Sequence, residues 1–94
     1  PTIIVCLGGT AAQSVLGQRL SIREQRGKHH SGPGGATVLV TYHPAAVLRT
    51  EDREERERMF GDLAATLSEA RRLVRGEETH QRQHEMMEIM SAVS

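Results

Sequence analysis

Two continuous apolar runs stand out in the pattern of hydrophobic and polar positions along the chain. Residues 3–7 read Ile-Ile-Val-Cys-Leu, and residues 37–42 form a second, largely β-branched run. Continuous apolar runs of this length are typical of strands that are covered on both faces in a parallel sheet. We therefore predict two buried strands, the first of which ends at Gly8 and Gly9.

Each predicted strand is followed by a helical pattern. Thr10 can cap a short helix over residues 11–16, and Gly17 is a natural end for it. Residues 53–75 form a longer pattern in which apolar positions recur three and four residues apart. These positions are Met59, Phe60, Leu63, Ala64, Leu67, Ala70, Leu73 and Val74. The second pattern predicts a long amphipathic helix with one apolar face.

The ends of the long helix carry signals of their own. Thr50 or Asp52 can accept a capping hydrogen bond at its start, where acidic residues fill the first turn. Arginines fill its last turn, which suits the negative end of the helix dipole. Gly76 is expected to end the helix.

The segments outside these elements are less regular. Residues 20–24 alternate and predict either a short edge strand or an extended crossing segment. Residues 27–36 hold four glycines and one proline, which predicts a surface loop. Residues 77–94 are polar up to Gln83 and then carry an apolar patch, so they predict either a loose tail or a helix docked on another chain. The patch consists of Met86, Met87, Ile89 and Met90.

The order of these elements predicts an α/β fold. Two buried strands of the parallel type, joined by a helix and followed by a long helix, form part of a three-layer α/β/α domain with a parallel sheet. Two strands rarely make a sheet alone, so a missing N-terminal half or a second copy of the chain is expected to supply more. The chain begins at Pro1, directly before the first strand, and we expect it to be the C-terminal part of a longer protein. We assign residues 1–76 to this domain and residues 77–94 to a polar, Met-containing tail.

Charge and cysteine content limit the possible partners and compartments. Twelve basic and twelve acidic residues cancel, so no overall field draws the chain to nucleic acid or to a membrane. A basic segment is nevertheless present, and it comprises Arg19, Arg23, Arg26, Lys28, His29 and His30. The single cysteine, Cys6, excludes a disulfide within the chain and agrees with a reducing compartment. With no apolar run of membrane-spanning length and no signal segment, we expect a soluble, cytoplasmic protein.

The exit of the second strand carries the candidate functional residues. His43 follows the apolar run directly, and Pro44 ends the strand because it has no amide hydrogen. Leu48 and Arg49 follow five and six residues later. An imidazole at this position can hydrogen-bond a small ligand, and a leucine on the following turn can act as a wedge. From the residues alone, each also has a structural interpretation: a capping histidine, a core leucine and a solvated arginine.

Together, two motifs resemble the C-terminal half of uracil-DNA glycosylases, most closely the iron–sulfur family-4 type. In that family a strand ends in Leu-Gly-Ala/Gly-Thr-Ala-Ala, and a later strand ends in His-Pro-Ser-x-x-Leu-Arg. This chain has Leu-Gly-Gly-Thr-Ala-Ala at residues 7–12 and His-Pro-Ala-Ala-Val-Leu-Arg at residues 43–49. The resemblance covers residues 2 to about 75. Ala45 stands where the family has serine, so a hydroxyl that would contact the DNA backbone or steady the loop is lost.

The resemblance implies a role in DNA base-excision repair, in which the parent protein flips uracil out of the duplex and hydrolyses its N-glycosidic bond. It assigns His43 a hydrogen bond to the uracil carbonyl, which stabilises negative charge on the departing base. It assigns Leu48 to the space that the flipped nucleotide leaves, and Arg49 can pair with a backbone phosphate. Lys28, His29 and His30 form a candidate phosphate-contacting patch.

The resemblance also places several functional groups upstream of this segment. These groups are the water-positioning acidic loop, the aromatic that stacks on uracil, the asparagine that reads its edge and the four cysteines of the cluster. Cys6 does not occupy a cluster position, so we expect no cofactor in this chain and an inactive fragment. The expected partners are uracil-containing DNA and the missing half or a second copy, with no membrane.

Two other functions are compatible with the sequence. One is a non-catalytic assembly fragment that uses the long helix and the Met-rich tail. The other is a small nucleotide-binding α/β module that uses residues 8–10, although no phosphate-loop or dinucleotide motif is present. A zinc site is not expected, because His29 and His30 lack ligand spacing with the lone cysteine, and His80 and His84 lack a third ligand.

Overall fold

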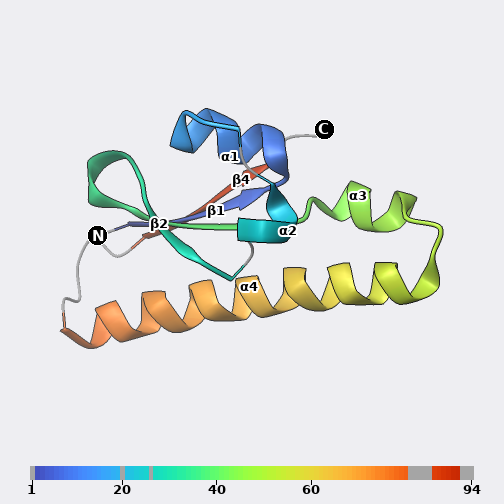
Figure 1. Ribbon diagram of the computed structural model, residues 1–94. Helices are drawn as coiled ribbons and strands as arrows, with labels where there is room; N and C mark the ends of the chain where they lie inside the picture. The colour runs from blue at the N-terminus through green and yellow to red at the C-terminus, as the bar shows by residue number, and fades with distance from the viewer. Residues whose placement is uncertain (1, 20, 26, 81–85, 92–94) are drawn as a thin grey trace.

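The structure is a computed structural model, and it describes residues 2–19, 21–25, 27–80 and 86–91. Its elements are, in order, β1 (Thr2–Leu7), α1 (Gly9–Leu16), α2 (Ile22–Gln25), β2 (His29–Ser31), the 3₁₀ turn η1 (Pro33–Gly35), β3 (Thr37–Thr41), α3 (Pro44–Arg49), α4 (Arg53–His80) and β4 (Met86–Ser91). Figure 1 shows α3 beyond one end of the sheet, with α4 running along the sheet below it.

The strands form one mixed sheet in the order β2-β3-β1-β4. β1 pairs in parallel with both β3 and β4, which confirms the α/β class and the two predicted strands. The sheet is mostly parallel, with β2 as an antiparallel neighbour of β3. The short connection through η1 explains this, because a parallel pairing needs a crossover of a dozen residues or more.

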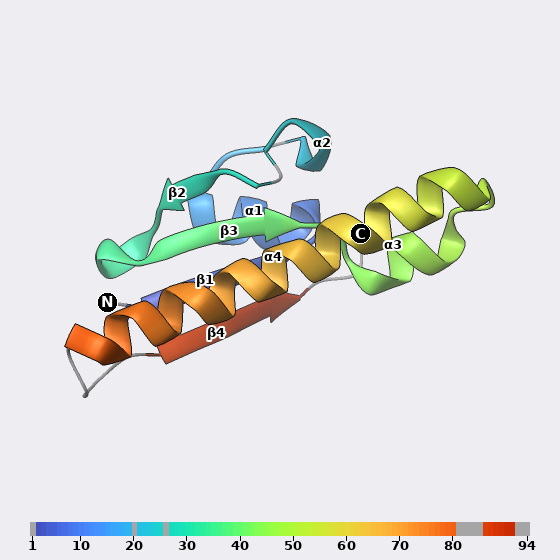
Figure 2. The same ribbon diagram turned by 90° about the horizontal axis from the view of Figure 1, so that it is seen from below.

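Helices cover both faces of this sheet, as the three-layer prediction requires (Figures 1 and 2). On one face, Ile4 and Cys6 of β1 pack with Ala12 of α1. On the other face, Val5 of β1 packs with Leu63 of α4. Successive residues of a strand point to opposite faces, so β1 contributes to both cores at once.

The corner between β1 and α1 is built on Gly8 rather than on Thr10. Gly8 has a φ of 98°, a conformation that favours glycine, and it is the residue that precedes the first turn of α1. Its N–H donates to the Thr41 carbonyl at 2.9 Å, which ties the corner to the end of β3. Thr10 makes no capping hydrogen bond, because the helix already begins at Gly9. Gly17 ends α1 in the left-handed region, as predicted.

Asp52 is the cap of α4. Its Oδ1 accepts hydrogen bonds from the backbone N–H groups of Glu54 at 2.9 Å and Glu55 at 3.2 Å. The prediction that Gly76 ends this helix is wrong, since α4 continues to His80. A glycine inside a helix costs only about 1 kcal/mol relative to alanine, which a helix packed on a sheet can absorb.

Three segments adopt structures that the sequence pattern did not indicate. Within residues 27–36, for which the sequence predicts a surface loop, residues 29–31 form β2 and residues 33–35 form η1. Residues 22–25 form the short helix α2 instead of an edge strand or crossing segment. In the predicted tail, residues 86–91 form β4 rather than a loose segment or a docked helix, because the open edge of β1 offers them a backbone ladder. Pro1, Leu20, Arg26 and His84 lie outside the described residues, and the domain division at residue 76 stays a prediction.

Within the described part of the chain, no helix combines the length and the apolar character needed to cross a membrane.

Candidate functional site

The two sequence motifs meet at the carboxyl ends of β1 and β3. These strands are parallel neighbours, with Leu7 in register with Thr41. The Gly8 corner is hydrogen-bonded to Thr41, and His43 follows two residues later. Ligands of parallel α/β sheets bind beyond the carboxyl ends of the strands. The carboxyl ends of β1 and β3 are therefore the natural place for a site.

The imidazole of His43 has one nitrogen engaged in the local fold. Its Nδ1 accepts a hydrogen bond from the Ala45 N–H at 2.9 Å, which makes His43 the N-cap of α3. A nitrogen that accepts a hydrogen bond carries no proton, so in the neutral ring the proton lies on Nε2. The half-buried ring therefore presents an N–H donor at the strand end. The capping role and the donor role are compatible, since they use different nitrogens.

The hydrogen bond that caps α3 can form with alanine at position 45, where the family has serine. The hydrogen bond to His43 comes from the backbone of Ala45, so it does not require the hydroxyl of a serine. Pro44 occupies the first turn of α3, where its missing N–H costs nothing. The His43 backbone is extended, with φ −75° and ψ 138°, as expected for a residue that precedes proline.

Leu48 projects into solvent from α3. Its side chain is 78% exposed, whereas the neighbouring Val47 is 4% exposed and anchors the helix. The core interpretation of Leu48 is therefore wrong in this structure. Arg49 is also exposed, in the last turn of α3, on the same short helix that His43 caps.

A small hydrogen-bonded turn, which the sequence did not single out, fixes α3 against α4. The Thr50 hydroxyl donates to the Ala46 carbonyl at 2.8 Å and lies 3.3 Å from the sulfur of Met59. The guanidinium of Arg56 donates to the Thr50 carbonyl at 3.0 Å. Thr50 is one of the two predicted caps of α4, but its hydroxyl serves the end of α3 instead.

An apolar hollow lies between α3 and α4, next to Leu48. Phe60, which the helical pattern assigned to the apolar face of α4, is 62% exposed at its rim. Ala64 of that predicted face is exposed as well. The start of α4 extends beyond the sheet in Figure 1, and the short helix α3 packs against this part. The hollow is lined by Val47, Leu48, Arg56, Glu57, Phe60 and Gly61.

The predicted phosphate patch does not form one surface. His29 pairs with Leu39 in the ladder, and its Nε2 lies 3.4 Å from Oε2 of Glu69 on α4. His30 pairs with Val38 and therefore points to the opposite face, where its Nε2 is buried without a hydrogen-bond partner in the described structure. Strand alternation separates the two histidines. Lys28 stays exposed, toward the end of β3 that leads to His43.

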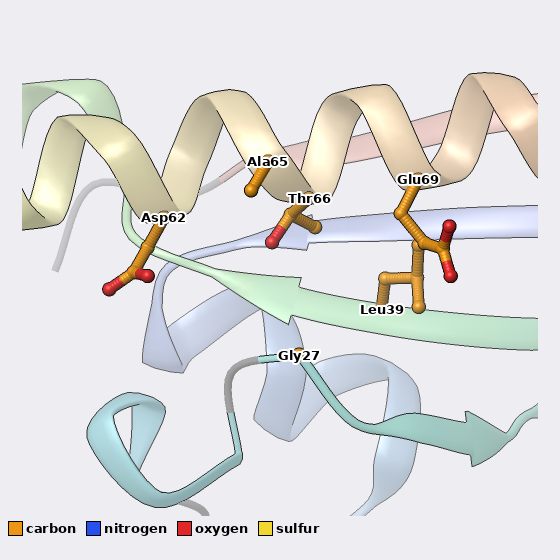
Figure 3. A pocket seen from close by; sticks show the side chains of 6 residues that line it. All are labelled: Gly27, Leu39, Asp62, Ala65, Thr66 and Glu69. Carbon is orange, nitrogen blue, oxygen red and sulfur yellow. The ribbon is translucent and has the colours of Figure 1, made fainter.

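The hollow beside His29 is acidic, which disfavours phosphate there. It has a volume of about 340 Å³ and is lined by Gly27, Leu39, Asp62, Ala65, Thr66 and Glu69 (Figure 3). The hydrogen bond from Arg72, and a further one from His29, lower the pKa of the Glu69 carboxyl, so it is ionised at neutral pH. Carboxylates only accept hydrogen bonds when ionised, so Asp62 and Glu69 offer no donor to a phosphate oxygen.

Comparison with known proteins identifies related sequences. The family model described as the uracil DNA glycosylase superfamily matches residues 1–68. A type-4 uracil-DNA glycosylase of Thermotoga maritima is 36% identical over 64 residues, which cover 67% of this chain and 33% of the relative. The chain thus spans about a third of the length of that relative. No solved structure matches it significantly.

The residues present do not fit an iron–sulfur cluster. Such clusters are held by four ligands, chiefly cysteine thiolates, and this chain has one cysteine. Cys6 is buried inside β1, and burial raises the pKa of its thiol, which disfavours the thiolate. Among the described residues, no group of three or more His, Cys, Asp or Glu side chains is placed to hold a metal ion.

The exposure of Leu48 leads to a stability prediction. Leu48→Ala should change the free energy of unfolding by less than about 0.5 kcal/mol, because little apolar surface leaves water at this position. The matched control is Leu63→Ala, in which a leucine of 8% exposure is truncated. That variant should lose about 2 to 5 kcal/mol. Chemical denaturation of both variants measures the difference, and equal losses would place Leu48 in the core.

Proposed function

Because the chain belongs to the uracil-DNA glycosylase superfamily, we propose that it forms the part of a uracil-DNA glycosylase that contacts the uracil base and the opened duplex. The complete enzyme hydrolyses the N-glycosidic bond of uracil in DNA, as a step of base-excision repair in a reducing, cytoplasmic compartment. The observation that carries this proposal is the His43 ring, held through Nδ1 at the strand end with an exposed leucine on the helix it caps.

His43 is proposed to act on the leaving base. Cleavage of the glycosidic bond places negative charge on uracil, and a donor accelerates the reaction only if it binds the developing anion more strongly than the substrate. The hydrogen bond from Ala45 supports this role, because it leaves the Nε2–H of the neutral ring as the donor. One positioned donor of this kind contributes about 3 to 4 kcal/mol to the barrier.

Leu48 is proposed to fill the gap that the flipped nucleotide leaves in the base stack. Extrusion of a base costs a few kcal/mol, and an apolar side chain in the gap offsets part of this cost. The exposure of Leu48 supports the proposal, as does the buried Val47 that anchors the same helix. Arg49, one residue further, is proposed to contact a phosphate of the same strand.

The remaining basic residues have unequal support as DNA contacts. Lys28 keeps its proposed phosphate contact, since it is exposed near the site-bearing end of β3. His29 and His30 are weaker candidates, because one is held near Glu69 and the other has a buried Nε2. The water-positioning groups, the base-stacking aromatic and any cluster ligands would come from another part of the enzyme.

The isolated chain should not excise uracil, because groups that position water and stack the base are not among its candidate site residues. The purified chain would be incubated with a uracil-containing duplex, and abasic sites would be measured by alkaline strand cleavage. A chimaera in which this chain replaces the matched segment of the Thermotoga maritima relative should regain activity. Metal-independent turnover by the chain alone would contradict the proposal that the water-positioning and base-stacking groups come from another part of the enzyme.

In that chimaera, His43→Ala should lower the single-turnover rate by about 100-fold or more and leave DNA affinity nearly unchanged. The matched control is His43→Asn, which keeps an N-cap acceptor for the Ala45 N–H but removes the Nε2 donor. If His43 serves only as a cap, the asparagine variant should retain the activity that the alanine variant loses. Equal losses in both variants support the donor role.

Leu48→Ala in the chimaera should reduce excision from paired duplex more than from single-stranded DNA, where no stack has to be opened. Val47→Ala provides the matched control one residue away, since it loosens the anchor of α3 without removing the exposed side chain. Single-turnover rates on the two substrates give the comparison. An equal defect on both substrates would remove Leu48 from the site.

A further inference from the structure

The outer edge of β1 is the part of the sheet that the proposed function leaves unexplained. The family match ends at residue 68, so within it the sheet consists of β2, β3 and β1. On the β3 side, this sheet ends at β2, a three-residue antiparallel strand with the sequence His-His-Ser. A short, polar edge strand is a common way to terminate a sheet.

β1, in contrast, has the character of an interior strand. Its residues from Ile3 to Leu7 are continuously apolar and between 0 and 8% exposed. Parallel strands of this kind are found inside sheets with a neighbour on each side. The matched relative is about three times as long as the matched segment, so most of its domain lies outside this region. The β1 edge, opposite β3, is therefore better suited than the edge of β2 to receive further strands of a complete domain.

In this chain, that edge is taken by β4, which lies outside the family match. β4 runs parallel to β1 in register from Thr2 with Met86 to Leu7 with Ser91. Two of its apolar side chains are poorly covered, since Ile89 is 50% and Met90 is 39% exposed. Consecutive residues point to opposite faces, so neither helix layer fully covers β4. Figure 2 shows β4 at the margin of the sheet, alongside α4.

We propose that β4 is a displaceable strand that occupies the β1 edge until a strand from the complementary part of a uracil-DNA glycosylase domain docks there. The inference rests on the proposed function, because it takes the chain to be one part of a site completed by another. The partner is a parallel, continuously apolar strand, since it must match the buried faces of β1 on both sides. Exchange would replace one backbone ladder by another and gain the side-chain burial that β4 lacks.

The register explains how such docking would complete the site. Ser91 of β4 lies opposite Leu7, so the carboxyl end of a strand in this place lies beside the Gly8 corner. The Gly8 corner is bonded to the end of β3, which leads to His43. A docked strand that runs in the same direction would therefore bring the loop that follows it to the end of the sheet that carries His43. While β4 holds this position, that loop has no access.

A reversible covalent lock tests the displacement directly. Cys6 and Met90 are register partners on β1 and β4. Neighbouring strands are about 4.8 Å apart, which lies within the range that a disulfide can bridge. Met90→Cys in the full chain therefore gives a strand that is locked when oxidised and free when reduced, with lock formation verified by intact mass. Met90→Ser, treated in the same way, controls for the oxidant and for the loss of methionine.

The binding partner used is the portion of the Thermotoga maritima relative that lies outside the matched segment, produced as a separate polypeptide. Association would be measured by sedimentation velocity in both redox states. We expect the reduced Met90→Cys variant and the control to bind, and the oxidised variant to bind at least about tenfold more weakly. Equal binding in both states, or no binding by the reduced chain, would overturn the proposal.

Uracil excision by the same mixtures separates this inference from the proposed function. Redox-dependent association without any excision would support the displaceable strand and contradict the glycosylase role. Excision at the same rate in both redox states would support the glycosylase role and contradict the displaceable strand. In the unmodified chain, amide hydrogen exchange gives an independent readout, because β4 should exchange faster than β3 if it opens locally. Equal protection of the two strands would also overturn the proposal.

Discussion

The parallel pairing of β1 with β3 is the constraint on which the rest of the structure depends. It places the carboxyl ends of both strands at the same end of the sheet, where the Gly8 N–H donates to the Thr41 carbonyl. Two motifs more than thirty residues apart in the chain thereby become neighbours. Both strands are buried on both faces, so the pair cannot slip by one residue without exposing its apolar side chains. The position of His43 is fixed by this register.

His43 shows how one side chain can serve both the fold and the proposed chemistry. Nδ1 completes the first turn of α3, and this contact fixes the tautomer that leaves a proton on Nε2. The same helix carries Leu48 outward because Val47 is buried beneath it. Thr50 and Arg56 then hold the end of α3 against α4. The imidazole and the leucine are thus presented by one short, well-anchored helix.

The two outer strands of the sheet, β2 and β4, differ in length and polarity. β2 ends the sheet with short, polar residues, and His29 turns toward Glu69 on α4. β4 ends it with exposed Ile89 and Met90 next to β1, whose residues from Ile3 to Leu7 are buried. An exposed apolar edge strand is a site for pairing with other chains, whereas a short polar strand is not. This asymmetry is the basis of the proposal that a further strand docks on the side of β1.

The sequence by itself determined β1, β3, the short helix α1, the capped start of α4 and the place of His43 at a strand exit. These features depend on local patterns of apolar residues, glycine, proline and capping groups, which act within a few residues. Only the tertiary structure decided that Gly76 stays helical, that Phe60 is exposed, that β2 is antiparallel and that residues 86–91 form a strand. Each of these depends on which distant segment lies alongside, and packing against a neighbour outweighs the small intrinsic preferences of single residues.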